Sequence, residues 1–169
     1  MPAPDPLLAA SGATVRRTFA DMRQTIAEFP PDALNWKPAG EDTNSVAVLT
    51  THSLHSTRSW LCTALGERLP DRDRDSEFRV AEEDPEALLA LFDEMAGQCT
   101  ALFDSPRDVD WAAIRRTHTR PDASDAIQVP AAWALLHAIE HLREHLGQMQ
   151  LTRQLWDARN AKWEMGNGQ

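Results

Sequence analysis

Residues 135–149, LLHAIEHLREHLGQM, carry the clearest helical pattern in the chain. Their apolar side chains recur at steps of three and four residues, and this spacing places them on one face of an α-helix. The face is made by Leu135, Ala138, Ile139, Leu142, Leu146, Met149 and, further on, Trp156. The pattern predicts a long helix from Pro130 to about Arg159 with one side packed against a core.

Three earlier segments have the same periodicity. Apolar residues form helical stripes within residues 15–29 and 88–102, and a mixed stripe with the same spacing is made by Ser45, Leu49, His52, Ser56, Trp60 and Thr63. The signals that cap or end these helices are Pro30, Thr43 or Asn44, Gly66 and the Asp-Pro-Glu run at 84–86. Four amphipathic helices predict an all-α four-helix bundle, with residues 1–169 as a single domain.

Two long connections join the second helix to the third and the third to the fourth. Residues 67–83 are dense in charged side chains, which predicts a solvated link outside the core with a short extended piece at 78–80. Residues 104–129 contain prolines and small polar groups, and a link of this length either crosses the bundle or serves a function. Trp111 and Ile114 are expected to pin it to the bundle.

Composition restricts the class of partner. The 169 residues are 42% hydrophobic and 25% charged, with a net charge of −9 and no evident basic patch, so neither nucleic acid nor an anionic membrane surface is an expected partner. The sequence has no apolar stretch long enough to cross a bilayer and no signal-peptide pattern, so we expect a soluble, cytoplasmic protein. Cys62 and Cys99 lack metal-site spacing and are expected to be buried thiols.

The histidines suggest a metal site. His141 and His145 lie four residues apart, so both imidazoles can reach one ion while another helix supplies a third ligand. His52 lies within the stripe of the second helix, whereas the helical neighbours of His55 are polar. His137 lies on the side of the fourth helix away from its apolar arc. We therefore favour His52, His141 and His145 as ligands; the alternative is a helix whose histidines border the core.

One competing motif shares these residues. His137, Glu140 and His141 match the H-x-x-E-H spacing of inverted zinc peptidases, in which the glutamate activates a zinc-bound water. Those enzymes need an acidic ligand well downstream and a larger fold, and too few residues follow His141. No G-x-S-x-G motif or phosphate-binding glycine loop occurs, so neither serine-hydrolase nor nucleotide chemistry is indicated.

Several short motifs together resemble the DinB family of DinB/YfiT-like proteins. In and before the second helix they are Leu34-Asn-Trp36-Lys-Pro38-Ala-Gly40, Thr43-Asn44-Ser45-Val46, and Thr51-His52 followed by Ser56, Arg58 and Trp60. In the fourth helix they are His137, Glu140-His141, His145 and Gly147-Gln148. Their order and spacing agree with the family over most of residues 10–157.

The resemblance implies a fold and a metal. It implies an up-up-down-down four-helix bundle, often a homodimer, in which three histidines at one end hold a divalent ion, commonly nickel or zinc. Those ligands fall on His52, His141 and His145. Two positions depart from the pattern: Leu146 stands where arginine is common, and His55 where a small residue is common. Some relatives are similar to S-transferases or isomerases that use a low-molecular-weight thiol, and many have no assigned reaction.

Two functions from different classes follow. The first is a metal-dependent enzyme acting on a small molecule, a transferase or hydrolase, including a thiol-dependent S-transferase or isomerase in which the ion lowers the pKa of a bound thiol. Glu140 or Glu144 would orient a ligand imidazole or accept a proton, or else be a solvated side chain. The alternative is a non-catalytic metal-binding or stress-associated interaction protein.

A homodimer is expected from the family resemblance and from the six tryptophans of this small chain. Trp156 and Trp163 are the candidate surface residues, although Trp156 also shares the apolar arc and can instead close the core.

Overall fold

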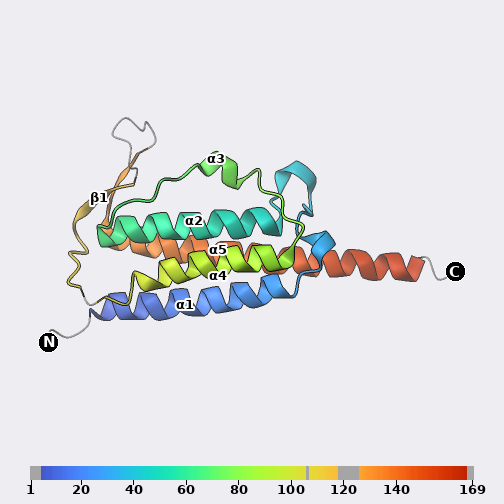
Figure 1. Ribbon diagram of the computed structural model, residues 1–169, viewed down its shortest axis with the longest axis horizontal. Coiled ribbons are helices and arrows are strands. Elements are labelled where there is room, and N and C mark those ends of the chain that lie inside the picture. Colours follow the sequence, from blue (N-terminus) through green and yellow to red (C-terminus); the bar gives the residue numbers. More distant parts are fainter. Residues whose placement is uncertain (1–4, 106, 118–125, 167–169) are drawn as a thin grey trace.

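Four long helices pack side by side in the computed structural model, which describes residues 5–105, 107–117 and 126–166, with side chains up to residue 161 (Figure 1). They are α1 (Pro6–Ala27), α2 (Val46–Leu65), α4 (Pro85–Ala101) and α5 (Ala131–Gly166). Shorter elements are the 3-10 turns η1 (Pro31–Ala33) and η2 (Gly40–Asp42), and helix α3 (Arg74–Glu77). Strands β1 (Ile114–Arg116) and β2 (Gln128–Pro130) pair antiparallel, with Ile114 opposite Pro130. The predicted four-helix bundle is confirmed, with both long connections in place.

The helix ends follow from capping side chains. Asp5 accepts hydrogen bonds from the first turn of α1, and Asp84 does so for α4, where Pro85 takes the first helical position. The cap of α2 is Ser45, whose side chain accepts from the Val48 N–H, rather than the expected Thr43 or Asn44. The Thr43 hydroxyl instead accepts from the Ala39 N–H and closes the preceding turn.

Helices α1 and α5 run in one direction, and α2 and α4 run in the other (Figure 1). The Ala47 N–H donates to the Leu34 carbonyl, so α2 starts close to where α1 ends. The Asn35 side chain exchanges two hydrogen bonds with the Glu82 backbone, which brings the start of α4 to the same end. Two parallel pairs are present, but they are α1 with α5 and α2 with α4, so the order along the chain is up, down, down, up instead of up, up, down, down. The reason is that residues 28–45 fold into 3-10 turns at one end instead of crossing the bundle.

The core lies between the four helices and is built from the predicted stripes of α1, α4 and α5, whereas in α2 the fully buried Leu54 and Leu61 lie outside the predicted stripe. Its largest fully buried side chains include Met22, Ile26, Leu54, Leu61, Leu88, Phe92, Leu135, Leu142 and Met149. Trp156 is only 9% exposed and packs on Trp36, with ring centroids 5.3 Å apart, so it closes the core instead of offering a dimer surface. The side chain of Trp163 lies outside the described residues.

The connection between α2 and α4 differs from its prediction. It crosses over α2 and forms the single helical turn α3, where Asp73 caps the turn by accepting from the Ser76 N–H (Figure 1). The expected extended piece at 78–80 is not a strand, and Glu77 is buried at 3% exposure. The many charged residues of this connection predicted a fully solvated link, and this prediction is wrong for Glu77.

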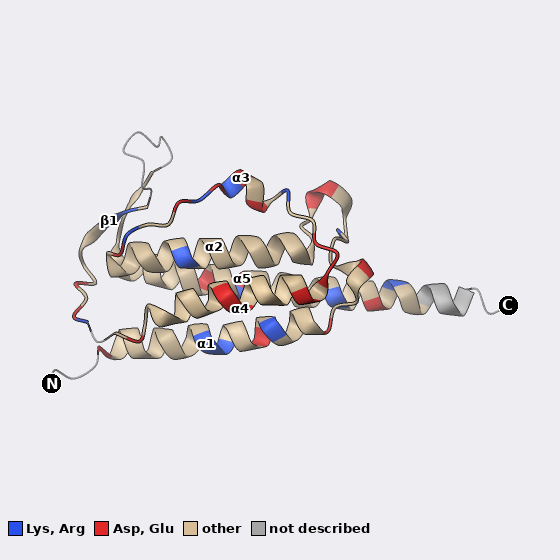
Figure 2. Cartoon of the chain, in the orientation of Figure 1, with Lys and Arg blue, Asp and Glu red and all other residues tan. Residues whose placement is uncertain are grey.

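The second connection is tied down at one of its two expected points. The Trp111 indole N–H donates to Asp5 at 2.7 Å, but Ile114 is largely exposed in β1. Many charged residues lie in the connections between the helices, whereas α2 carries a single one, Arg58 (Figure 2). Among the described residues, no helix is both long and apolar enough to cross a bilayer.

Two leucines test the assignment of the core. Leu88 is 1% exposed and Leu136 is 59% exposed, and both lie within helices. Leu88→Ala should lower the free energy of unfolding by about 2–5 kcal/mol, because it leaves a cavity between packed helices. Leu136→Ala removes the same atoms from the surface and should change it by no more than about 0.5 kcal/mol. Urea denaturation of both variants measures the difference, and equal losses would contradict this core.

Candidate metal centre

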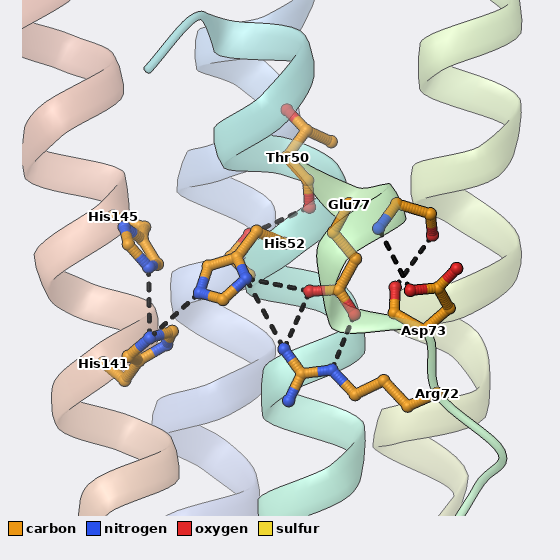
Figure 3. A network of polar contacts seen from close by, with 9 residues as sticks. Thr50, His52, Arg72, Asp73, Glu77, His141 and His145 are labelled. Atoms are coloured by element: carbon orange, nitrogen blue, oxygen red, sulfur yellow. Dashed lines mark hydrogen bonds and ion pairs between the residues drawn. The ribbon is translucent and has the colours of Figure 1, made fainter. Parts of the chain in front are cut away.

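Helices α2 and α5 bring three histidines together. They run antiparallel as neighbours, and His141 and His145, one turn apart on α5, face His52 on α2 (Figure 3). The His52 Nε2 lies 3.4 Å from the His141 Nε2, and the His145 Nε2 lies 3.2 Å from the same atom. His52 and His145 are buried, and His141 is partly buried.

These separations suit a shared metal ion. Metal–nitrogen bonds of 2.0–2.1 Å in tetrahedral directions place two ligand nitrogens about 3.3–3.4 Å apart. Among the described residues, His52, His141 and His145 form the cluster in which one ligand atom from each could bind the same ion. The residue types fit as well, because imidazole nitrogen is a preferred ligand of zinc and nickel.

Hydrogen bonds on the far sides of two rings set which nitrogen is free. His52 Nδ1 lies 2.9 Å from the Glu77 Oε2, and His145 Nδ1 lies 2.9 Å from the Gln148 Oε1. Both oxygens are acceptors, so each Nδ1 donates its proton and each Nε2 keeps a lone pair. Two lone pairs therefore point at the Nε2 of His141, and a cation is the natural partner of such a group.

The third ring has an orphaned atom. The buried Nδ1 of His141 has no hydrogen-bond partner among the described residues. In the neutral ring one nitrogen carries a proton and the other a lone pair. If Nε2 binds an ion, Nδ1 carries that proton, so a water or a bound ligand beside His141 would complete the set.

Burial favours the uncharged form of His141 and His145. Desolvation, with the nearby His145 and His52 adding to it, lowers the pKa of His141 from 6.5 to about 3. Desolvation also lowers the pKa of His145, although the hydrogen bond to Gln148 works against it. Neutral imidazole is the form that coordinates metal. At neutral pH His141 therefore need not release a proton before it binds an ion.

Glu77 and Arg72 lie on the Nδ1 side of His52. Glu77 ends the α3 turn, and Arg72, just before that turn, contacts both of its oxygens, from Nε at 2.6 Å and from Nη2 at 2.8 Å (Figure 3). Burial raises the pKa of Glu77, but the hydrogen bonds from Arg72 and His52 outweigh it and hold that pKa below its ordinary value. Phe78 covers the His52 ring, with centroids 4.6 Å apart.

The other sequence candidates lie apart from this cluster. His55 is half-buried on α2, and desolvation lowers its pKa. Glu140 is exposed and lies 4.0 Å from His137, whereas Glu144 accepts from the Gln148 amide and so reaches His145 only through Gln148. The carboxylate that contacts a candidate ligand directly is Glu77, which the sequence reasoning missed because nothing distinguishes it from its charged neighbours.

His137 belongs to an aromatic group next to the cluster. Its ring stacks on Trp133, with centroids 4.9 Å apart and planes 10° apart, and meets Trp60 edge-on at 4.5 Å. The His137 and His141 centroids are 5.7 Å apart, and His137 is absent from the group of potential ligands. This arrangement supports the interpretation of the H-x-x-E-H match as a coincidence of spacing.

Both cysteines are free and buried, as expected. Burial raises the pKa of the Cys99 thiol to about 12 and also raises that of Cys62, so neither thiol is poised to ionise at neutral pH.

The comparisons with known proteins agree with this arrangement. A family model described as the DinB superfamily matches residues 14–149. The chain belongs to the DinB superfamily. A comparison with curated protein sequences finds no significant match. The family therefore rests on the match of its model, and the solved structures below extend the comparison to the fold.

Several solved structures share the fold of this DinB protein. A conserved protein from Enterococcus faecalis has a TM-score of 0.65 at 18% identity, covering 87% of this chain and 95% of its own. YfiT from Bacillus subtilis, described as a probable metal-dependent hydrolase with an unusual four-helix bundle topology, has a TM-score of 0.62 at 18% identity, covering 91% and 90%. A mycothiol-dependent maleylpyruvate isomerase has a TM-score of 0.62 at 14% identity; the match covers 84% of this chain but 60% of the isomerase.

The low pKa of His141 can be measured in the metal-free protein. Since that pKa is about 3, the ring signals of His141 should stay those of neutral imidazole from about pH 8 to about pH 5. Histidines of the urea-unfolded chain should titrate near pH 6.5. Long-range ¹H–¹⁵N spectra across this range test the difference, and a midpoint near 6 in the folded protein would contradict it. Because the unfolded chain takes up this proton first, folding stability should fall as the pH drops from about 6.5 towards 3.

Proposed function

We propose that this DinB protein is a metal-dependent enzyme that acts on a small molecule, with one divalent ion held by His52, His141 and His145. The observation that carries the proposal is the convergence of three imidazole Nε2 atoms at separations of 3.2 and 3.4 Å around His141. Two helices from distant parts of the sequence supply them, and hydrogen bonds orient two of the rings for coordination through Nε2.

The number of protein ligands supports a reactive rather than a structural site. Structural zinc sites are closed by four protein ligands, whereas catalytic sites keep three and leave a position open. A divalent ion bound here would supply Lewis acidity that lowers the pKa of a thiol or water near neutral pH. The protein's own contribution is to hold three neutral imidazoles and to shield them from bulk water.

A thiol-dependent reaction is the finer part of the proposal. The mycothiol-dependent isomerase and the metal-dependent hydrolase share this fold, which leaves both thiol-dependent transfer or isomerisation and hydrolysis within reach of the same site. In the transfer, a thiolate sulfur would attack an electrophilic carbon, forming a carbon–sulfur bond while the leaving group takes the electron pair. Nickel or zinc as the metal, a homodimer and a cytoplasmic location complete the proposal.

Paired alanine variants test the ligand set. His52→Ala, His141→Ala and His145→Ala should each weaken zinc and nickel binding by more than the roughly 10–100-fold that loss of an outer partner costs. His55→Ala and His137→Ala remove the same side chain from the same helices without removing a ligand, so both should bind metal like the parent protein. Competition with a chromogenic chelator measures the affinities. Retained binding in His52→Ala, or loss in His137→Ala, would refute this ligand set.

Turnover separates the enzyme from a passive metal binder. Metal-free protein and protein reloaded with zinc or nickel should be compared with mycothiol or glutathione as the thiol and a chlorinated nitroaromatic electrophile. Maleylpyruvate serves as a second substrate. We expect thioether formation or isomerisation only in the metal-loaded parent and not in metal-treated His141→Ala. Metal binding without turnover of any tested substrate would favour a non-catalytic metal-binding or interaction protein.

A further inference from the structure

Glu77 is the one buried residue in the long connection between α2 and α4. Every other residue from 66 to 84 is partly or fully exposed. Burial of a carboxylate costs several kcal/mol unless partners compensate it, so a buried acid in a surface link calls for a specific explanation. The fold does not need a charge at this position to close the core, since the core lies between the four long helices.

The Glu77 side chain lies between His52 and Arg72. Its Oε2 accepts from His52 Nδ1 at 2.9 Å, and Arg72 donates to both of its oxygens. Because the guanidinium of Arg72, which can only donate, bonds both oxygens of Glu77, the carboxylate acts as an acceptor on both sides. The proton between Glu77 and His52 therefore belongs to Nδ1, which leaves the lone pair on Nε2, the atom that faces His141 and His145.

Arg72 determines what the carboxylate can do. Its guanidinium donates one hydrogen bond to each oxygen of Glu77, which is the bidentate geometry that arginine commonly forms with carboxylates. Figure 3 shows Glu77 and Arg72 on the side of His52 opposite to His141 and His145. Held in this way, Glu77 contacts the Nδ1 side of His52 and not the side where the three Nε2 atoms meet.

We propose that Glu77 is a positioning residue of the metal centre. It holds His52 in the tautomer and orientation that coordinate through Nε2, and Arg72 holds Glu77. The proposal rests on the metal function proposed above for His52, His141 and His145. It also gives the α2–α4 connection a role. The α3 turn, capped by Asp73, places the Glu77 carboxylate beside His52.

The two orienting contacts of the site are unequal. His145 is oriented by the neutral amide of Gln148, whose residue is exposed, whereas His52 is oriented by a buried, ionised group. Hydrogen bonds to a charged acceptor are roughly twice as strong as those to a neutral one. A carboxylate also increases the electron density that the imidazole offers to a cation, so the loss of Glu77 should affect affinity more than the loss of Gln148.

Glu77→Gln tests the proposal with little change in size. Zinc affinity, measured by chelator competition, should fall by about 10–100-fold, and by less in Gln148→Ala. Glu83→Gln is the matched control, because it removes the same charge from an exposed residue of the same connection, and it should bind zinc like the parent protein. His52→Ala marks the affinity expected when one ligand is lost.

A spectroscopic measurement separates positioning from a merely structural role. In metal-free parent protein, long-range ¹H–¹⁵N spectra should show His52 protonated at Nδ1 only. In Glu77→Gln they should show a mixture of both tautomers, while the circular dichroism stays that of the parent. Lower zinc affinity with an unchanged His52 tautomer would overturn the proposal, as would parent-like affinity in Glu77→Gln. An X-ray absorption spectrum of the zinc-loaded parent that shows a protein carboxylate ligand, lost in Glu77→Gln, would also overturn it.

The same experiments distinguish failure of the proposed function. If the parent protein and His52→Ala bind zinc equally weakly, the three histidines are not a metal site and both ideas fall together. If the parent binds zinc, His52→Ala loses it, and Glu77→Gln retains it, the metal site stands and only the role of Glu77 is refuted.

Discussion

The Nε2 atom of His141 lies 3.2 Å from that of His145 and 3.4 Å from that of His52, and neighbouring rings this close cannot both carry a positive charge without repelling each other. Burial meets this requirement by lowering the pKa of His141 and His145. As a consequence, Nε2 lone pairs face one another inside the cluster, with fewer protons than are needed to pair them all in hydrogen bonds. The helices that carry the histidines, their caps and the connection over α2 all serve to keep this group assembled.

The pairing of α2 with α5 is the largest part of that support. The two helices run antiparallel and share an extensive interface, so His52 and His141, which are 89 positions apart in sequence, meet at one level of the bundle. The Leu34–Trp36 segment supports this interface from one end, where Leu34 accepts from Ala47 at the start of α2 and Trp36 packs on Trp156 of α5. Motif residues with no chemistry of their own thereby help to hold together the two helices that carry the three histidines.

Shared fold and shared chemistry are separate matters in this family. Proteins with 14–18% identity to this chain adopt the same bundle and carry descriptions as different as hydrolase and isomerase. Such variety is expected when the bundle supplies a rigid frame and a few side chains around the site decide the reaction. Two features would distinguish the site of this chain. One is the neighbouring group of Trp60, Trp133 and His137 rings, and the other is the contact made by the α2–α4 connection.

Local periodicity was sufficient to determine the helices and, through the helical wheel, to prefer His52 over His55 and His145 over His137, because the side of a helix that a residue occupies follows from its spacing alone. The spacing of Asp84, Pro85 and Glu86 likewise determined the start of α4. The order of helix directions was not determined in this way, since it depends on where residues 28–45 turn, and a backbone bond such as Ala47 to Leu34 leaves no mark on the sequence. The burial of Glu77 was decided by tertiary structure alone: a carboxylate among many charged neighbours is recognisable as a partner of His52 only when Arg72 and the α3 turn bring it there.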